Sequence, residues 1–169
     1  MNLVFFSIGS NEGDRLDNIS KSILLLNKYI GETIAISSIY ENPPFGFEAD
    51  LNFYNLCLSI RTDEPPESIL FHIKNIEKEI GRKTKSVNGV YSSRCIDIDI
   101  LFYENYLIDT GELSIPHIQL YFRRFVLEPL FEIAREFIDP KTGLTISVLL
   151  DRCEDKSQLI KLPIYKEFK

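Results

Sequence analysis

The sequence predicts an α+β domain in which helices pack on a largely antiparallel sheet. Segments with strand-like alternation and segments with helical spacing of apolar residues follow one another in the order β-α-β-β-α-β. That order is typical of the split βαβ, ferredoxin-like sandwich, which leaves one face of the sheet free for a ligand. A length of 169 residues and an apolar fraction of 44% indicate one globular domain, residues 1–169, with a substantial core.

The order begins with a strand over residues 2–10, which ends in a turn at Gly9-Ser10-Asn11. Asn11 or Asp14 is a suitable N-cap for the next helix, because either side chain can accept a hydrogen bond from the first turn. Apolar residues at helical spacing predict that this helix continues to Gly31: Leu16, Ile19, Ile23, Leu24, Leu26 and Ile30.

A second strand is predicted over residues 33–40 and a third over residues 51–62. Between them, the segment Pro43-Pro44-Phe45-Gly46-Phe47 predicts a rigid irregular loop. Its two phenylalanines either stack on a planar ligand or pack on the core. In the third strand, Asn55 shares a face with Phe53, and its amide either reads the edge of a heterocycle or makes a structural hydrogen bond.

A second helix is predicted to begin at Pro65-Pro66, where proline is tolerated, and to end at Gly81. Residues 82–94 then form a loop that contains cations and no acid: Arg82, Lys83, Lys85 and Arg94. In an acidic chain such a segment suits the binding of a polyphosphate, although an ordinary solvated loop has the same composition.

The strand after this loop carries the most informative pattern. It places Ile96, Ile98 and Ile100 on one face and Asp97 and Asp99 on the other. The two acidic Cα atoms are expected roughly 6.5 to 7 Å apart. That spacing suits a pair of divalent metal ions about 3.5 to 4 Å apart. A half-buried strand with one solvated face has the same pattern, so both interpretations stay open.

The remaining elements are shorter. Glu104-Asn105 predicts a hairpin turn with residues 106–108 as the returning strand. A helix is predicted to begin near Pro129. Residues 136–169 are interpreted as a C-terminal extension of the same domain, with a short helix over residues 145–153.

Composition and charge argue against several classes of protein. A net charge of −6 disfavours a general nucleic-acid-binding surface. No apolar run approaches the roughly 18 residues of a membrane span. Residues 1–4 resemble no targeting signal, so we expect a cytoplasmic protein, and we expect a monomer. Cys57, Cys95 and Cys153 match neither a zinc site nor a disulfide framework.

Several ordered blocks together resemble the 6-hydroxymethyl-7,8-dihydropterin pyrophosphokinase family of the folate pathway, over residues 1–135. The blocks are Ser7-Ile8-Gly9-Ser10-Asn11-Glu12-Gly13-Asp14, Tyr40 with Pro43-Pro44-x-Gly46, Phe53-x-Asn55, Ile76-Glu77 with Gly81-Arg82, Arg94-x-x-Asp97-Ile98-Asp99-Ile100-Leu101, Pro116-His117, and Arg123-x-Phe125-Val126-Leu127-x-Pro129-Leu130.

This resemblance implies transfer of diphosphate from ATP to the hydroxymethyl group of the pterin, with release of AMP. Asp97 and Asp99 would hold two Mg²⁺ ions, and the catalytic set would also include Arg82 and Arg94. The pterin would stack between Phe45 and Phe125. The residues implied for the pterin are Asn42, Pro43, Pro44, Phe45, Phe53, Asn55 and Phe125. The residues implied for ATP are Leu70, Glu77, Arg82, Arg94, Ile100, Ser114, His117, Ile118 and Arg123.

Two positions depart from the family pattern. Thr84 stands where a second arginine is frequent, and Glu112 stands where a basic residue would help to bind the nucleotide. Two other functions compete with the pyrophosphokinase. One is a catalytically silent ligand-binding domain on the same fold. The other is a metal-dependent nuclease that uses the same carboxylates, which the net charge of −6 disfavours.

Overall fold

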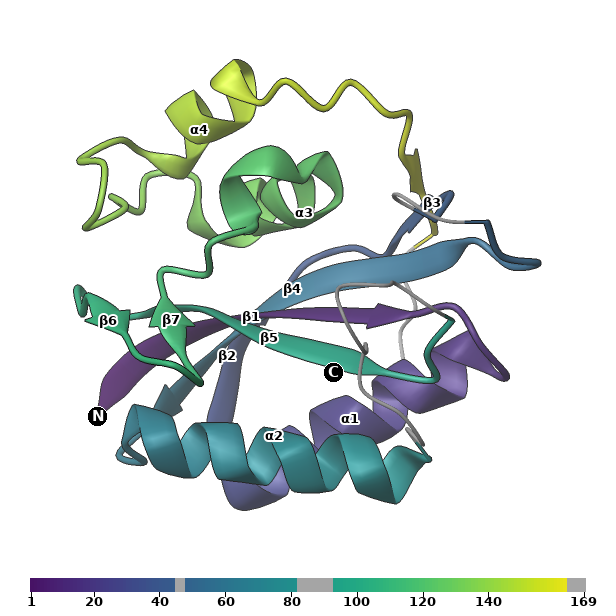
Figure 1. Cartoon of the computed structure of the whole chain (residues 1–169), viewed down its shortest axis with the longest axis horizontal. Helices are drawn as coiled ribbons and strands as arrows, with labels where there is room; N and C mark the ends of the chain where they lie inside the picture. The colour runs from purple at the N-terminus through teal and green to yellow at the C-terminus, as the bar shows by residue number, and fades with distance from the viewer. Residues whose placement is uncertain (45–47, 82–92, 164–169) are drawn as a thin grey trace.

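The computed structural model describes residues 1–44, 48–81 and 93–163 and consists of a sheet between two pairs of helices (Figure 1). Helices α1 (Arg15–Tyr29) and α2 (Pro66–Ile80) cover one face. Helices α3 (Arg124–Ala134) and α4 (Ile146–Arg152) lie over the other. The α+β class with an antiparallel sheet is confirmed. The expectation of helices on one face alone is wrong, because the second face also carries apolar side chains that require burial.

The sheet begins at its edge strand β5 (Asp97–Tyr103), and the next strand is β1 (Asn2–Ser10). Strand β1 lies between β4 (Phe53–Thr62) and β5, antiparallel to both. The far edge is built from short strands that pair antiparallel with β4 or with one another: β2 (Glu32–Ile36), β3 (Tyr40–Asn42) and β8 (Ile160–Lys161). The strand order around β1 therefore brings together segments that are distant in the sequence.

Alternation along the strands divides the core into two apolar clusters. On the α1/α2 side, Leu56, Leu58 and Ile60 of β4 pack with Ile98 and Ile100 of β5. On the α3/α4 side, buried side chains of the sheet and of the two helices form the second cluster, which includes Phe5, Cys57, Leu101, Phe102, Val126, Leu127, Leu130 and Leu149. The predicted faces of the third strand and of the acidic strand are thus confirmed.

The predicted strand over residues 33–40 is two strands rather than one. Ile36 pairs with Leu58 and Tyr40 pairs with Asn55, so the β2–β3 segment has one residue more than β4 between these pairs. The extra residue interrupts the ladder as a bulge does. The hydroxyl of Ser37 accepts a hydrogen bond from the backbone N–H of Cys57 at 2.9 Å, which satisfies a donor at the break.

The ends of the first two helices agree with the sequence. Asp14 is the N-cap of α1, where its Oδ1 accepts a hydrogen bond from the N–H of Asp17 at 3.0 Å. Pro66 begins α2, and Gly81 ends it with a φ of 116°, a left-handed conformation that favours glycine.

Two elements of the second half differ from the prediction. Helix α3 begins at Arg124 and not near Pro129, which lies inside the helix and is buried there. The lost N–H of Pro129 deprives only the Phe125 carbonyl of a helical partner. The strand after the Glu104-Asn105 turn, β6 (Ile108–Asp109), pairs with β7 (Ser114–Ile115) and not with β5. The chain beyond β7 covers that edge instead, since the N–H of His117 donates to the Leu101 carbonyl.

Within the described residues, no helix has the length and apolar character needed to cross a lipid bilayer.

The buried stripe of α1 gives a test of the fold. Leu26 is fully buried, whereas Leu24 on the same helix is 68% exposed. We expect Leu26→Ala to lower the free energy of unfolding by about 2–5 kcal/mol, because it removes transfer energy and leaves a cavity. Urea denaturation measures this value, with Leu24→Ala as the matched control. Equal losses for the two variants would contradict the assignment of the helix face.

Candidate active site

Asp97 and Asp99 lie on the face of β5 opposite the isoleucines, as the alternation predicts. Neither side chain faces open solvent: their exposed fractions are 24% and 32%. Asp97 stands opposite Gly9 of β1, and Asp99 stands opposite Ser7. The pair therefore lies in a recess of the α3 side of the sheet and not on a fully solvated surface.

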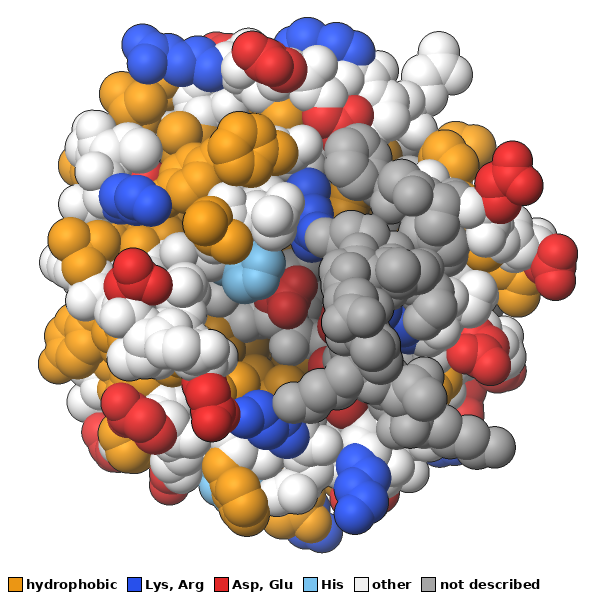
Figure 2. Space-filling model, in the orientation of Figure 1, with side chains coloured by type: hydrophobic (Ala, Val, Ile, Leu, Met, Phe, Trp, Pro, Cys, Tyr) orange, Lys and Arg blue, Asp and Glu red, His pale blue; other side chains and the backbone are white. Residues whose placement is uncertain are grey.

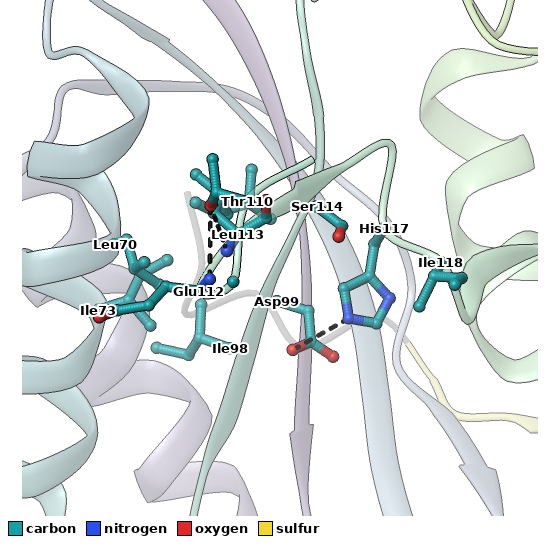
Figure 3. A pocket seen from close by; sticks show the side chains of 12 residues that line it. Leu70, Ile73, Ile98, Asp99, Thr110, Glu112, Leu113, Ser114, His117 and Ile118 are labelled. Atoms are coloured by element: carbon teal, nitrogen blue, oxygen red, sulfur yellow. Dashed lines mark hydrogen bonds and ion pairs between the residues drawn. The ribbon is translucent and has the colours of Figure 1, made fainter. Parts of the chain in front are cut away.

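Basic side chains surround the two carboxylates. Arg94, just before β5, donates from its guanidinium Nη1 to Oδ2 of Asp97. His117 Nε2 is 3.7 Å from Oδ1 of Asp99, and the two side chains point toward one another (Figure 3). His117 Nδ1 accepts a hydrogen bond from the N–H of Gln119 at 3.3 Å, which leaves the ring proton of a neutral imidazole on Nε2. The ring is thus oriented with a donor toward the acid.

Burial and the neighbouring Asp97 carboxylate together raise the pKa of Asp99, while His117, Arg123 and Arg94 act in the opposite direction. Burial is the largest of these causes, so the direction of the shift reflects mainly the cost of holding a charged carboxylate away from water. Two carboxylates in this condition favour a bound cation. Within the described residues, no group of three or more His, Cys, Asp or Glu side chains could hold a metal ion.

A cavity of about 270 Å³ opens beside Asp99. Five residues from the predicted nucleotide set line it: Leu70, Ile100, Ser114, His117 and Ile118. Leu70 comes from α2, Ile100 from β5, and the others from β7 and the segment after it. The same face shows a hollow in which a histidine side chain lies next to an acidic one (Figure 2). The described structure thus brings together most of the described nucleotide candidates.

Other candidates lie outside the cavity lining. Glu77 is buried in α2, and its Oε1 accepts a hydrogen bond from the N–H of Ile98 at 2.9 Å, a contact that joins α2 to β5. Arg123 follows the short 3-10 helix Leu120–Phe122, and its guanidinium carbon is 5.7 Å from the centre of the Phe125 ring. Phe45 and Arg82 lie outside the described residues.

A pair of buried amides lies on the other side of Gly9. Nδ2 of Asn55 donates to Oδ1 of Asn42 at 2.6 Å, and Nδ2 of Asn42 donates to the Pro43 carbonyl at 2.9 Å. This contact is the structural hydrogen bond that the sequence left open for Asn55. It also holds the end of β3, where Pro43 is exposed and Pro44 half-buried, against β4.

Gly9 joins the amide pair to the carboxylate pair. In the register of the sheet it stands opposite Asn55 on β4 and opposite Asp97 on β5. Since neighbouring strands lie about 4.8 Å apart, the Cα atoms of Asn55 and Asp97 are roughly 10 Å apart. A Cβ atom at position 9 would come within 2.5 Å of Oδ1 of Asn55. Glycine is therefore required at position 9, between Asn55 and Asp97.

Two half-buried aromatic side chains come from the elements next to the row, and the Phe53 ring lies close to Gly9. Phe53 lies on β4 two residues before Asn55, and Phe125 lies in the first turn of α3. On the same face of β4, Sγ of Cys57 is 3.5 Å from the Val126 carbonyl oxygen, which brings α3 against β4 next to this region. Helix α3, which bears Phe125, thus packs against the strand that bears Phe53 and Asn55.

The comparison with known families agrees with this arrangement. The family model described as 7,8-dihydro-6-hydroxymethylpterin-pyrophosphokinase (HPPK) matches residues 5–135. The chain belongs to the HPPK family.

Curated relatives support the HPPK assignment. A 2-amino-4-hydroxy-6-hydroxymethyldihydropteridine pyrophosphokinase of Porphyromonas gingivalis is 40% identical over 135 residues, which cover 79% of this chain and 92% of the relative. The protein of the same name from Aquifex aeolicus is 41% identical and covers 83% of this chain and 85% of its own length. The folic acid synthesis protein fol1 of Pneumocystis carinii is 36% identical over 96% of this chain, which corresponds to only 22% of that protein.

Solved structures show the same fold. Wild-type HPPK-DHPS of Plasmodium falciparum superposes with a TM-score of 0.74 at 18% sequence identity. The superposition covers 89% of this chain and 44% of the Plasmodium chain, so this chain spans less than half of that protein.

Sequence reasoning missed several residues of the cavity in this HPPK family member. Four of them come from α2 and from the connection between β6 and β7: Ile73, Thr110, Gly111 and Leu113. The connection closes on itself, with the N–H of Thr110 donating to the Leu113 carbonyl at 2.9 Å. Glu112, singled out earlier as a departure from the family, pairs with Lys74 Nζ at 2.7 Å. The only sequence signal for this lining was its proximity to Ser114.

The row through Gly9 yields a stability prediction. We expect Gly9→Ala to lower the free energy of unfolding by about 1–3 kcal/mol, because the added methyl group collides with Asn55. Chemical denaturation measures the loss, and Gly111→Ala is the control, since its added Cβ would meet no atom within 4 Å. Combining Gly9→Ala with Asn55→Ala should cost less than the sum of the single changes. Additive losses would contradict the proposed contact.

Proposed function

We propose that this chain transfers the diphosphate group of ATP to the hydroxymethyl group of 6-hydroxymethyl-7,8-dihydropterin and releases AMP. The observation that carries the proposal is the row Asn55–Gly9–Asp97, which joins a buried amide pair to a carboxylate pair beside a cavity. Membership of the HPPK family supports the same reaction. The roles of individual residues below are part of this proposal.

The pterin is assigned to the region between β4 and the beginning of α3, which we call the pterin recess. Its hydrogen-bonding edge would meet Asn42 and Asn55, whose amides offer both donors and acceptors in a buried setting. Phe125 would stack on one face of the ring, with Phe53 beside it. Pro43 and Pro44 would border the ring, and Phe45, outside the described residues, is assigned to its other face.

ATP is assigned to the cavity beside Asp99. Leu70, Ile100 and Ile118 offer apolar surface for the adenosine, and Ser114 offers a hydroxyl. The phosphates would extend toward Asp99, where His117, Arg94 and Arg123 supply positive charge or donors. Arg82, outside the described residues, is assigned to the phosphates as well. Glu77 supports this site through its bond to Ile98 and remains only a proposed ATP contact.

Asp97 and Asp99 are assigned to two Mg²⁺ ions. The chemistry of the pair fits: carboxylate oxygens are the protein ligands that Mg²⁺ accepts, usually one or two of them together with substrate phosphates. Bound Mg²⁺ neutralises phosphate charge and holds the phosphates in position for transfer.

The chain itself contributes position and charge to the transfer. The hydroxymethyl oxygen attacks the β-phosphorus in line, the bond from that phosphorus to the oxygen shared with the α-phosphate breaks, and AMP leaves with that oxygen. The hydroxyl proton is released to solvent. No protein nucleophile is needed, because such reactions depend mostly on alignment and on stabilisation of charge. Asn42, Asn55 and Phe125 would align the acceptor. Arg94, His117 and Arg123 would stabilise the negative charge on the phosphates during the transfer.

Detection of AMP tests the function directly. Incubation of the protein with ATP, Mg²⁺ and 6-hydroxymethyl-7,8-dihydropterin should yield AMP and the pterin diphosphate, separated by chromatography. A silent binding domain would bind ATP without forming AMP. A nuclease would cleave nucleic acid and leave the pterin unchanged.

Neutral replacements of the carboxylates test the proposed metal site. We expect Asp97→Asn and Asp99→Asn each to reduce turnover by about a hundredfold or more, because each removes several kcal/mol of charge stabilisation. Without Mg²⁺, Asp99→Asn should keep or raise the melting temperature. A raised pKa in the folded state means that the charged form costs stability at neutral pH, and asparagine carries no charge. Asp63→Asn, an exposed acid paired with the N-terminus, is the control.

Activity near the wild-type level in either carboxylate variant would contradict the assignment of that residue. Calorimetry with Mg²⁺ and a non-hydrolysable ATP analogue gives a second readout, since metal-dependent nucleotide binding should weaken in both variants.

The stacking role of Phe125 can be tested separately. We expect Phe125→Ala to weaken pterin binding by about 1–3 kcal/mol, the range for aromatic stacking on a base. Affinity for ATP should change much less. Phe122→Ala is a suitable control, because Phe122 is 62% exposed just before the same helix. Titration calorimetry with each ligand measures both values, and equal losses for the two ligands would speak against stacking.

A further inference from the structure

Residues 153–162 follow α4 and lie beyond the stretch 5–135 that the family model matches. This segment runs from α4 to the edge of the sheet, where β8 pairs with β3 (Figure 1, yellow). On the way it contacts both ends of α3, through Asp155 and through Lys161. Nothing in the proposed reaction uses either residue, so their contacts call for an explanation.

Asp155 meets the beginning of α3. Its Oδ2 accepts a hydrogen bond from the backbone N–H of Arg124 at 2.9 Å, while the helix's own N-cap, Arg123, provides no side-chain cap. A carboxylate from the tail thus satisfies a helix N–H that lacks a partner within the helix. Burial acts to raise the pKa of Asp155, but hydrogen bonds from Ser157 and Arg124 outweigh it and lower the pKa. The capped turn carries Phe125.

Lys161 meets the other end of α3. Its Nζ pairs with Oε1 of Glu132, which also accepts a hydrogen bond from the hydroxyl of Tyr40 at 2.6 Å. Oε2 of the same carboxylate accepts from the N–H of Ser38 at 2.7 Å. Glu132 therefore joins α3 to the segment that leads into β3. Lys161 holds this junction from β8, where it pairs in register with Tyr40.

The two contacts hold the elements that bear the proposed pterin residues, α3 and β3. Arg124 and Glu132 are eight residues apart, so the tail spans about 12 Å of the helix. One wall of the recess is α3, which bears Phe125. The other wall ends in Asn42, the last residue of β3, two residues after Tyr40. Movement of α3 relative to β3 would separate the stacking ring from the amides.

We propose that residues 153–162 act as a strap that fixes α3 and β3 relative to one another and so shapes the pterin site. Asp155 and Lys161 are positioning residues in this role, since neither reaches the recess itself. The inference rests on the proposed function for the identity of the ligand. It adds that a segment outside the matched family region determines pterin affinity.

The test compares disruptive and conservative changes at both contacts. Asp155→Ala removes the cap, whereas Asp155→Asn keeps an acceptor oxygen. Lys161→Met removes the cation, whereas Lys161→Arg keeps it. Lys161 is 54% exposed, so its replacement leaves the core intact. Lys21→Met is the control, because Lys21 also loses an ion pair, with Asp17, but on α1, far from the recess.

Each disruptive variant should raise both the pterin dissociation constant and KM about fivefold, an effect of the size expected for a lost helix cap. The ATP dissociation constant should stay near the wild-type value, and the conservative variants and the control should bind pterin as the wild type does. Calorimetric binding of the pterin in the absence of turnover keeps this result separate from the proposed reaction. If the wild-type protein bound pterin but formed no AMP, the result would contradict the proposed reaction and leave the strap unaffected.

The strap would be overturned by disruptive variants that lose thermal stability but bind pterin normally. It would also be overturned by equal losses of pterin and ATP affinity, which indicate general loosening. A wild-type protein that binds no pterin would overturn the strap together with the proposed function.

Discussion

The antiparallel register of β1 is the constraint on which the rest of the site depends. It places Gly9 between Asn55 of β4 and Asp97 of β5, so that groups more than forty positions apart in the sequence share one row of the sheet. A shift of one residue would turn every side chain of a strand to the other face. The isoleucines of β5 prevent such a shift, because Ile98 and Ile100 are buried against α1 and α2. Burial on one face thus determines the position of the acids on the other.

The charge distribution follows from the same placement. Asp97 and Asp99 are held near one another by the backbone of β5, and partial burial prevents water from screening their repulsion fully. Burial first, and the neighbouring Asp97 second, raise the pKa of Asp99, so the charged form of this side chain costs stability. Packing along the whole of β5, and not the site itself, offsets the free-energy cost of holding the two carboxylates together. Such prearranged charge is what transfer of a phosphoryl-type group requires, because little reorganisation is then needed during the reaction.

The two faces of the sheet differ in their roles. The α1/α2 face holds a continuous apolar cluster that supports the strand register. The other face is shared between the cluster under α3 and α4 and the proposed ligand recess. Helices α3 and α4 cover this face only in part, so apolar residues are buried there while the proposed substrates can still reach the site. The tail from residue 153 onward contributes to that compromise, because it fastens α3 from outside the core.

The sequence by itself determined the class of fold, the helix end at Gly81, and the faces of β4 and β5, and it limited the first N-cap to Asn11 or Asp14. Each of these depends on local properties: periodicity, capping and the conformational freedom of glycine. It also contained the motifs of the HPPK family, and with them the proposed site residues. The tertiary structure alone decided the start of α3, the break between β2 and β3, the pairing of β6 with β7 and the lining of the cavity. These features depend on contacts between distant segments, such as Asp155 with Arg124, Ser37 with Cys57 and His117 with Leu101. No local pattern encodes such contacts, because their energy comes from partners that only the folded chain brings together.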